Sequence, residues 1–283
     1  MEQALLVARP AAGLLRPGSR GQVLSAHARA LNLTLDGHFM AIVDPGLGVS
    51  PWALLAPAPP AGYAVCLAPG DAVACDAEAL RAAGWSLRWA GTPLWEPVPP
   101  RPAVAQRSGW LRTLAALDAA LAERGGALAG GLWAEPLRRR CLGLTAALAA
   151  GEAAAAVAAA HSLVGLGPGS TPAGDDLLAG CTAALVLYAA WGLLPAPLAP
   201  LGEALGAVCR AAAGRTTAIA AAELVAAATG ALVAPAGQLM AALAAGDAAA
   251  VTGAAAALLP LGHTSGADIA QGIRLAFAAL VAG

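Results

Sequence analysis

Two glycine-bracketed segments in the second half of the chain carry residues whose types and spacing could do chemistry. They read GLGPGSTPAGDDLLAG, residues 165–180, and LGHTSGADIAQG, residues 261–272. Both contain Gly-x-Asp-x-x-x-Gly, with Asp176 in the first and Asp268 in the second. A glycine loop at a helix start presents backbone amides to an anion, and a carboxylate can orient an amide nitrogen or hold a cation. Each segment therefore predicts part of a site for a small anionic ligand.

The first segment offers more polar groups than a helix start needs. We expect Thr171 to be the N-cap and Pro172 to take the first helical position, with Asp176 in the first turn, where the helix dipole stabilises negative charge. A well-capped buried helix is the alternative interpretation, but such a cap requires only one hydroxyl or acid. The surplus predicts a ligand, either an anion on the amides, a cation on the carboxylates, or both. The candidate ligand-binding residues are Gly167, Gly169, Ser170, Thr171 and Asp175.

The second segment repeats this design. Ser265 and Asp268 have the spacing of a capping box, and His263 precedes the expected helix. We hypothesise that two helix N-termini converge on one pocket, each with amides and one aspartate, where Asp176, Asp268 and His263 are the candidate catalytic residues and Ser265 is a further candidate ligand-binding residue. Chance periodicity in a chain rich in glycine and alanine is the alternative.

A third candidate is Gly214-Arg215-Thr216-Thr217, which should open another helix. A guanidinium beside hydroxyl groups suits phosphate or carboxylate, so Arg215 and Thr216 are candidate ligand-binding residues. The alternative is a threonine N-cap beside a solvated arginine.

The elements that must position these residues indicate an α+β fold, with a β-rich domain over residues 1–100 and a helical domain over 101–283. Asn32–Leu35 and His38–Val43 flank Asp36-Gly37, a favoured hairpin turn. Further strands are expected at 52–55, 63–67, 72–75 and 85–89. Closely spaced prolines over residues 97–102 predict an extended connector. A helix is expected over residues 109–123, and glycine and proline breaks divide the chain from Trp133 onward into about seven helices.

Composition excludes several classes of function. The net charge of -1 lacks the basic excess that nucleic-acid binding requires, and none of the 16 basic residues is lysine, which excludes P-loop and Schiff-base lysines. The five cysteines form no CxxC, so reduced thiols are expected. No secretory signal is visible, and we expect a cytoplasmic protein. Residues 177–194 are long and apolar enough for a membrane span, but a buried bundle helix is favoured because flanking arginines are absent.

With these three motifs in this order, the chain resembles the bacterial AllH-like family, most clearly over residues 163–280. The resemblance implies a subunit of an oxamate carbamoyltransferase in allantoin catabolism, a purine degradation pathway, working with companion subunits. The sequence of this chain departs from the usual family pattern at Ser170, Ala173 and Ala221.

By this resemblance the reaction exchanges a carbamoyl group between phosphate and an oxamate-like amide. Residues 167–171 would cradle phosphate or carboxylate and Arg215 and Thr216 would clamp it, while the three aspartates orient an amide nitrogen and His263 carries a proton. No cofactor is predicted, although the aspartates could bind Mg²⁺. The alternatives are a metal-dependent amidohydrolase and a non-catalytic structural subunit of a complex.

Overall fold

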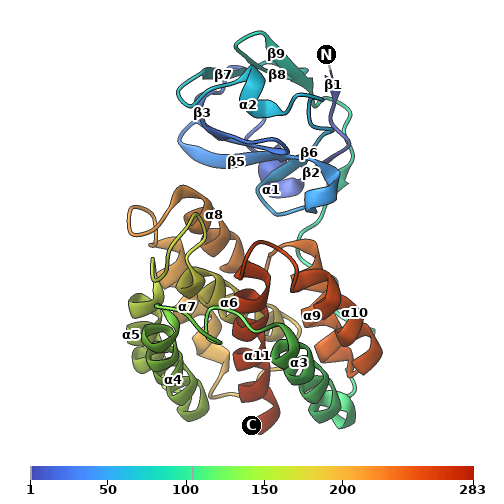
Figure 1. Ribbon diagram of the computed structural model, residues 1–283. Helices are drawn as coiled ribbons and strands as arrows, with labels where there is room; N and C mark the ends of the chain where they lie inside the picture. The colour runs from blue at the N-terminus through green and yellow to red at the C-terminus, as the bar shows by residue number, and fades with distance from the viewer. Residues whose placement is uncertain (1, 104) are drawn as a thin grey trace. The chain divides into compact units, whose positions relative to one another are not determined.

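The computed structural model describes residues 2–103 and 105–283, which form two compact units, Met1–Pro97 and Val98–Gly283. The first unit is built mainly of strands, and the second consists of helices and loops over its described residues (Figure 1). The predicted α+β class, with the β-rich part first, is confirmed. The break between the units falls within the proline-rich connector.

The N-terminal unit is one curled ten-stranded sheet with the strand order β1-β9-β8-β7-β3-β4-β5-β6-β2-β10. Its core includes Leu31, Leu33 and Leu35 from alternate positions of one strand, all fully buried. The short helices α1 (Arg9–Ala12) and α2 (Tyr63–Cys66) accompany the sheet. The strands are β1 (Glu2–Gln3), β2 (Leu6–Ala8), β3 (Arg20–Ala26), β4 (Ala30–Leu35), β5 (His38–Val43), β6 (Ala53–Leu55), β7 (Ala72–Cys75), β8 (Ala79–Ala82), β9 (Trp85–Arg88) and β10 (Leu94–Trp95).

The predicted hairpin is confirmed. Leu35 pairs with His38, and the two turn residues Asp36 and Gly37 have φ of 49° and 80°, as a two-residue turn of the favoured type requires. The expected strand at 63–67 is wrong, because residues 63–66 form the helical turn α2. Tyr63 is fully buried while the next three residues are exposed, so this segment lacks the alternation that a half-buried strand needs.

The C-terminal unit contains nine α-helices over its described residues. The helix expected at 109–123 is α3, and eight helices follow Trp133 where about seven were expected. All five cysteines of the chain are free, and four of them are buried. The helices are α3 (Trp110–Arg124), α4 (Ala134–Ala150), α5 (Ala153–Leu163), α6 (Ala173–Ala190), α7 (Ala199–Arg210), α8 (Ala218–Ala227), α9 (Ala234–Ala245), α10 (Ala248–Leu258) and α11 (Ser265–Ala282).

Helices α6 and α11 are the centre of this unit (Figure 1). By length and composition α6 could cross a membrane, but 83% of its apolar window is buried inside the unit, as in a core helix of a soluble protein. The two helices cross closely because glycine lies at the contact on each side. A Cβ on Gly180 would lie 2.1 Å from the Ile269 carbonyl oxygen, and one on Gly272 would lie 2.0 Å from the Leu177 carbonyl oxygen. The second glycine of each motif therefore has a packing role.

We predict that Gly180→Ala lowers the free energy of unfolding by about 2–3 kcal/mol, because the new methyl group forces the crossing helices apart. Urea unfolding followed by circular dichroism measures this change. Gly253→Ala is the matched control, since Gly253 lies inside α10 with no neighbouring atom within 4 Å of its added Cβ. That variant should gain about 0.5–1 kcal/mol from helix propensity. Equal effects of the two substitutions would contradict the close crossing.

The helices α4–α6 and α9–α11 repeat one design. The first helix of each set ends at a left-handed glycine, Gly151 or Gly246, and the second helix has 11 residues in both sets. At the start of the third helix, the Gly174 amide donates to the Leu166 carbonyl (2.8 Å) and the Gly266 amide to the Leu261 carbonyl (3.0 Å). The repeat makes Asp176 and Asp268 equivalent positions, and it extends well beyond the two glycine motifs.

Candidate ligand site among buried carboxylates

The loop between α5 and α6 carries the first motif. Gly167 and Gly169 have φ of 127° and 92°, which favours glycine at both positions. Helix α6 begins at Ala173 with Pro172 as its N-cap and no side-chain capping bond, so the expected N-cap at Thr171 is wrong. Pro172 is thus one position earlier than expected. The Thr171 hydroxyl is instead 2.9 Å from the Ser265 hydroxyl, and this bond joins the first two motifs.

The start of α11 carries the second motif. The helix begins at Ser265, with Thr264 as the N-cap and no side-chain capping bond, so the predicted capping box is wrong. Asp268 instead binds a loop outside its own helix: its Oδ1 accepts a hydrogen bond of 2.9 Å from the Ala127 amide in the loop after α3. His263 is exposed in the turn before α11. None of the hydrogen bonds recorded for the described residues joins His263 to the aspartates.

The third motif lies against the first. Thr217 is the N-cap of α8 and accepts from the Ala220 amide (3.1 Å), which confirms the threonine-cap interpretation, and its hydroxyl also donates to the Ser170 carbonyl. The Thr216 hydroxyl donates to Asp175 Oδ2 (2.6 Å).

Arg215 is exposed and binds a histidine rather than one of the acids. Its Nη1 lies 2.7 Å from His161 Nδ1, and its Nη2 donates to the His161 carbonyl (2.9 Å). The three motifs thus form one continuous hydrogen-bonded region, with Arg215 and Ser170 on its outer side.

Four carboxylates are buried in this region: Asp175, Asp176, Glu223 and Asp268 are each 0–3% exposed. Asp175 accepts bonds from Thr216 and from the Gly165 amide (2.9 Å). Neither oxygen of Asp176, nor Oδ2 of Asp268, accepts a hydrogen bond from an N–H or hydroxyl group recorded for the described residues, and the Asp176 carboxyl group lies close enough to that of Glu223 for the two to share a proton. A buried carboxylate without a partner costs free energy, so these oxygens need a proton, a cation or a ligand that donates N–H groups.

The protonation of these acids follows from their burial. Burial raises the pKa of Asp176 well above its usual value, and the negative charges of Glu223 and Asp268 raise it further. Burial raises the pKa of Glu223 to about 7 and that of Asp268 to about 6. The pKa of Asp175 is also raised by burial, against the opposing hydrogen bonds from Thr216 and Gly165. The cluster can therefore accept or release a proton near neutral pH.

Glu223 was not among the predicted site residues. It is the one charged residue of α8, an otherwise apolar alanine-rich helix, and a lone acid in such a helix is a signal of function or pairing. Over residues 2–103 and 105–283, no group of three or more His, Cys, Asp or Glu side chains is arranged to hold a metal ion.

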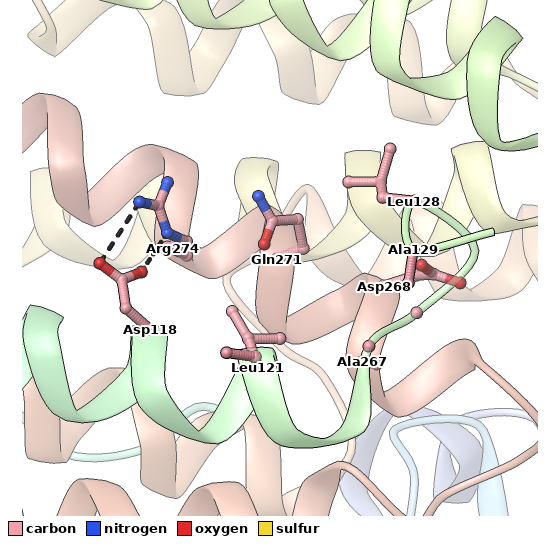
Figure 2. A pocket seen from close by; sticks show the side chains of 11 residues that line it. Asp118, Leu121, Leu128, Ala129, Ala267, Asp268, Gln271 and Arg274 are labelled. Carbon is pink, nitrogen blue, oxygen red and sulfur yellow. Dashed lines mark hydrogen bonds and ion pairs between the residues drawn. The ribbon is translucent and has the colours of Figure 1, made fainter.

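A pocket of about 380 Å³ opens beside this cluster, between α3 and α11 (Figure 2). Asp268 lines it together with Asp118, Gln271 and Arg274. Asp176 lies close enough to Asp268 for their charges to interact but does not line this pocket. The two aspartates are thus neighbours, and only the second faces this pocket.

Residues 163–277, which contain all three motifs, match the family described as oxamate carbamoyltransferase subunit AllH. No curated protein and no solved structure matches the chain.

Proposed function

We propose that this chain, whose residues 163–277 make it a member of the AllH-like family, is the carbamoyltransferase subunit that binds carbamoyl phosphate and a small amide-carboxylate acceptor such as oxamate. One observation carries the proposal: an AllH-like segment surrounds buried carboxylate oxygens that lack partners, next to a loop of positive-φ glycines. The loop suits the phosphate, and the carboxylates suit the amide nitrogens of both substrates.

The phosphate of carbamoyl phosphate would lie on the outer side of the region. Amides of the loop 167–171 and the Ser170 hydroxyl supply donors, and Arg215 supplies positive charge. The bonds from Arg215 to His161 hold the guanidinium near this loop, so little side-chain entropy is lost when an anion binds. Thr171 and Thr216 act through their bonds to Ser265 and Asp175, which position the loop.

The carboxylates would act on the nitrogens. In the transfer step the acceptor nitrogen bonds to the carbonyl carbon of carbamoyl phosphate, the bond from that carbon to the bridging oxygen breaks, and phosphate leaves. The nitrogen loses one proton, which a carboxylate of the Asp176 and Glu223 pair accepts, while Asp268 orients the acceptor amide. An acid whose pKa is near 7 suits this proton transfer at neutral pH. His263, which is exposed, would exchange that proton with solvent.

We further propose that the protein works in the cytoplasm with companion subunits, in allantoin catabolism as part of purine degradation. AllH is described as a subunit, which supports a hetero-oligomeric complex.

The test measures phosphate released from carbamoyl phosphate in the presence and absence of oxamate. The chain is assayed alone and with its companion subunits, each with and without Mg²⁺. We expect oxamate-dependent release by the complex, and an increase in KM for carbamoyl phosphate of about tenfold in Arg215→Gln, which removes a charge-assisted bond. Arg139→Gln, on the exposed face of α4, is the control.

The outcomes separate the alternatives. Unchanged activity of the complex when Asp176→Asn and Arg215→Gln are combined would assign this subunit a structural role. Mg²⁺-dependent release of ammonia from oxamate without carbamoyl phosphate would establish the amidohydrolase. Absence of any oxamate-dependent phosphate release by the complex would overturn the proposal.

A further inference from the structure

The pocket between α3 and α11 has opposite chemistry at its two ends (Figure 2). At one end Asp268 is 2% exposed, with Oδ1 held by the Ala127 amide and Oδ2 without a partner among the described residues. At the other end Arg274 pairs with Asp118 through Nε and Nη2. No hydrogen bond recorded for the described residues uses Arg274 Nη1, so this group remains available as a donor.

The spacing of the polar groups along α11 sets the size of a ligand. Asp268, Gln271 and Arg274 lie three residues apart, and Figure 2 shows Gln271 between the other two side chains. Six helical residues span about 9 Å. A short molecule with N–H donors at one end and a carboxylate at the other can therefore reach Asp268 and Arg274 together.

The helical repeat provides an internal comparison. The positions of α6 that correspond to Gln271 and Arg274 are Ala179 and Thr182, both fully buried in the core. The shared scaffold thus folds with small residues at these positions. The common fold therefore does not require a glutamine or an arginine at positions 271 and 274. The pocket that Gln271 and Arg274 line explains their presence.

The loop after α3 is shaped for the same site. A Cβ on Gly126 would lie 2.6 Å from Asp268 Oδ1, so glycine allows this loop to approach the carboxylate. The loop fixes one oxygen of Asp268, and the other oxygen is buried at this end of the pocket without a hydrogen bond from the described residues.

We infer that this pocket binds the acceptor of the transfer reaction, a short primary amide with an adjacent carboxylate. The amide N–H groups bind Asp268 Oδ2, and the carboxylate accepts from the Gln271 amide and Arg274 Nη1. The identity of the ligand rests on the proposed function, whereas the position and polarity of the site come from the pocket itself. Carbamoyl phosphate binds separately, at the loop 167–171.

The experiment is calorimetric titration of the full chain with oxamate. We expect Gln271→Leu and Arg274→Gln to weaken oxamate binding at least tenfold each. Gln238→Leu on the exposed face of α9 and Arg210→Gln, whose arginine pairs with Glu203 on α7, are the matched controls and should bind as the wild type. Oxalate, which carries a second carboxylate in place of the amide and therefore has no N–H group to donate to Asp268, should bind at least tenfold more weakly than oxamate.

Asp118→Asn separates ligand binding from a structural role. This substitution removes the ion pair but keeps the guanidinium, so oxamate binding should be unchanged or tighter if Arg274 holds the carboxylate. If the ion pair only supports the fold, Asp118→Asn and Arg274→Gln will weaken binding equally, which overturns the inference.

A second ligand distinguishes this inference from the proposed function. Titration with carbamoyl phosphate should be weakened by Arg215→Gln and unaffected by Gln271→Leu. Absence of oxamate binding at millimolar concentration, or oxamate binding that the pocket variants leave unchanged, overturns the inference even where carbamoyl phosphate binds. Absence of carbamoyl phosphate binding with intact oxamate binding would instead overturn the proposed donor site.

Discussion

Asp176→Asn is expected to lower carbamoyl transfer by the assembled complex by about 10²–10⁴-fold while stabilising the protein. Asp176 is fully buried beside Glu223, and neither of its oxygens accepts a hydrogen bond from an N–H or hydroxyl group recorded for the described residues. Asparagine keeps the shape, removes the charge and supplies an N–H₂ group that can donate to Glu223. At neutral pH the folded protein must either keep this buried acid protonated or leave it ionised without compensation, so its replacement should raise the free energy of unfolding by about 1–3 kcal/mol. The activity falls because the proton acceptor is lost.

Two measurements check this result together. Initial rates of oxamate-dependent phosphate release give the activity, and thermal unfolding should show a midpoint higher by several degrees, at about 2–4 °C per kcal/mol. Asp247→Asn is the matched control, because Asp247 is the exposed N-cap of α10 and asparagine caps a helix equally well. A variant of Asp176 that unfolds more easily and keeps its rate would show that this carboxylate supports only the fold.

Buried acids that support activity at the expense of stability are rare in an apolar sequence, and this rarity allowed the sequence to indicate the site. Helices α6, α8 and α11 are largely apolar, so burying four acids in them costs free energy of folding. The glycine motifs place two of these acids, Asp176 and Asp268, at equivalent helix starts. The class of fold followed from equally local signals, namely the Asp36-Gly37 turn, the prolines of the connector and the long alanine-rich helices.

The partners of these residues could not be predicted from the sequence. The capping pattern at Ser265 was misleading because the hydroxyl of Ser265 binds Thr171, and Asp268 binds the amide of Ala127 in a loop more than a hundred residues away. Both contacts are fixed by how the helices pack. Likewise, nothing in the sequence pattern of α3 showed that its end would form a pocket with Gln271 and Arg274.

The buried acids also predict an unusual dependence of stability on pH. The usual pKa values are 4.5 for Glu223 and 3.8 for Asp268, and burial raises these to about 7 and about 6 in the folded protein. Between pH 4 and 7 the folded state therefore binds more protons than the unfolded state, so stability falls as pH rises. A shift of about two units corresponds to roughly 3 kcal/mol for a single group, which sets the scale of the loss.

Urea unfolding between pH 4.5 and pH 8 measures this slope, and Glu223→Gln should flatten it because the glutamine does not titrate. Aspartates in ordinary ion pairs act at lower pH. Asp44 is held by Arg29, and the Glu78 amide and Arg81 bring the pKa of Asp76 to about 2, so both contribute stability that is lost only in acid. The interval above pH 4.5 thus reports on the buried cluster. If the wild type gains stability from pH 5 to pH 7.5, or if Glu223→Gln leaves the slope unchanged, the carboxylates must be ionised and compensated in the folded protein, and they could no longer serve as proton acceptors tuned by burial.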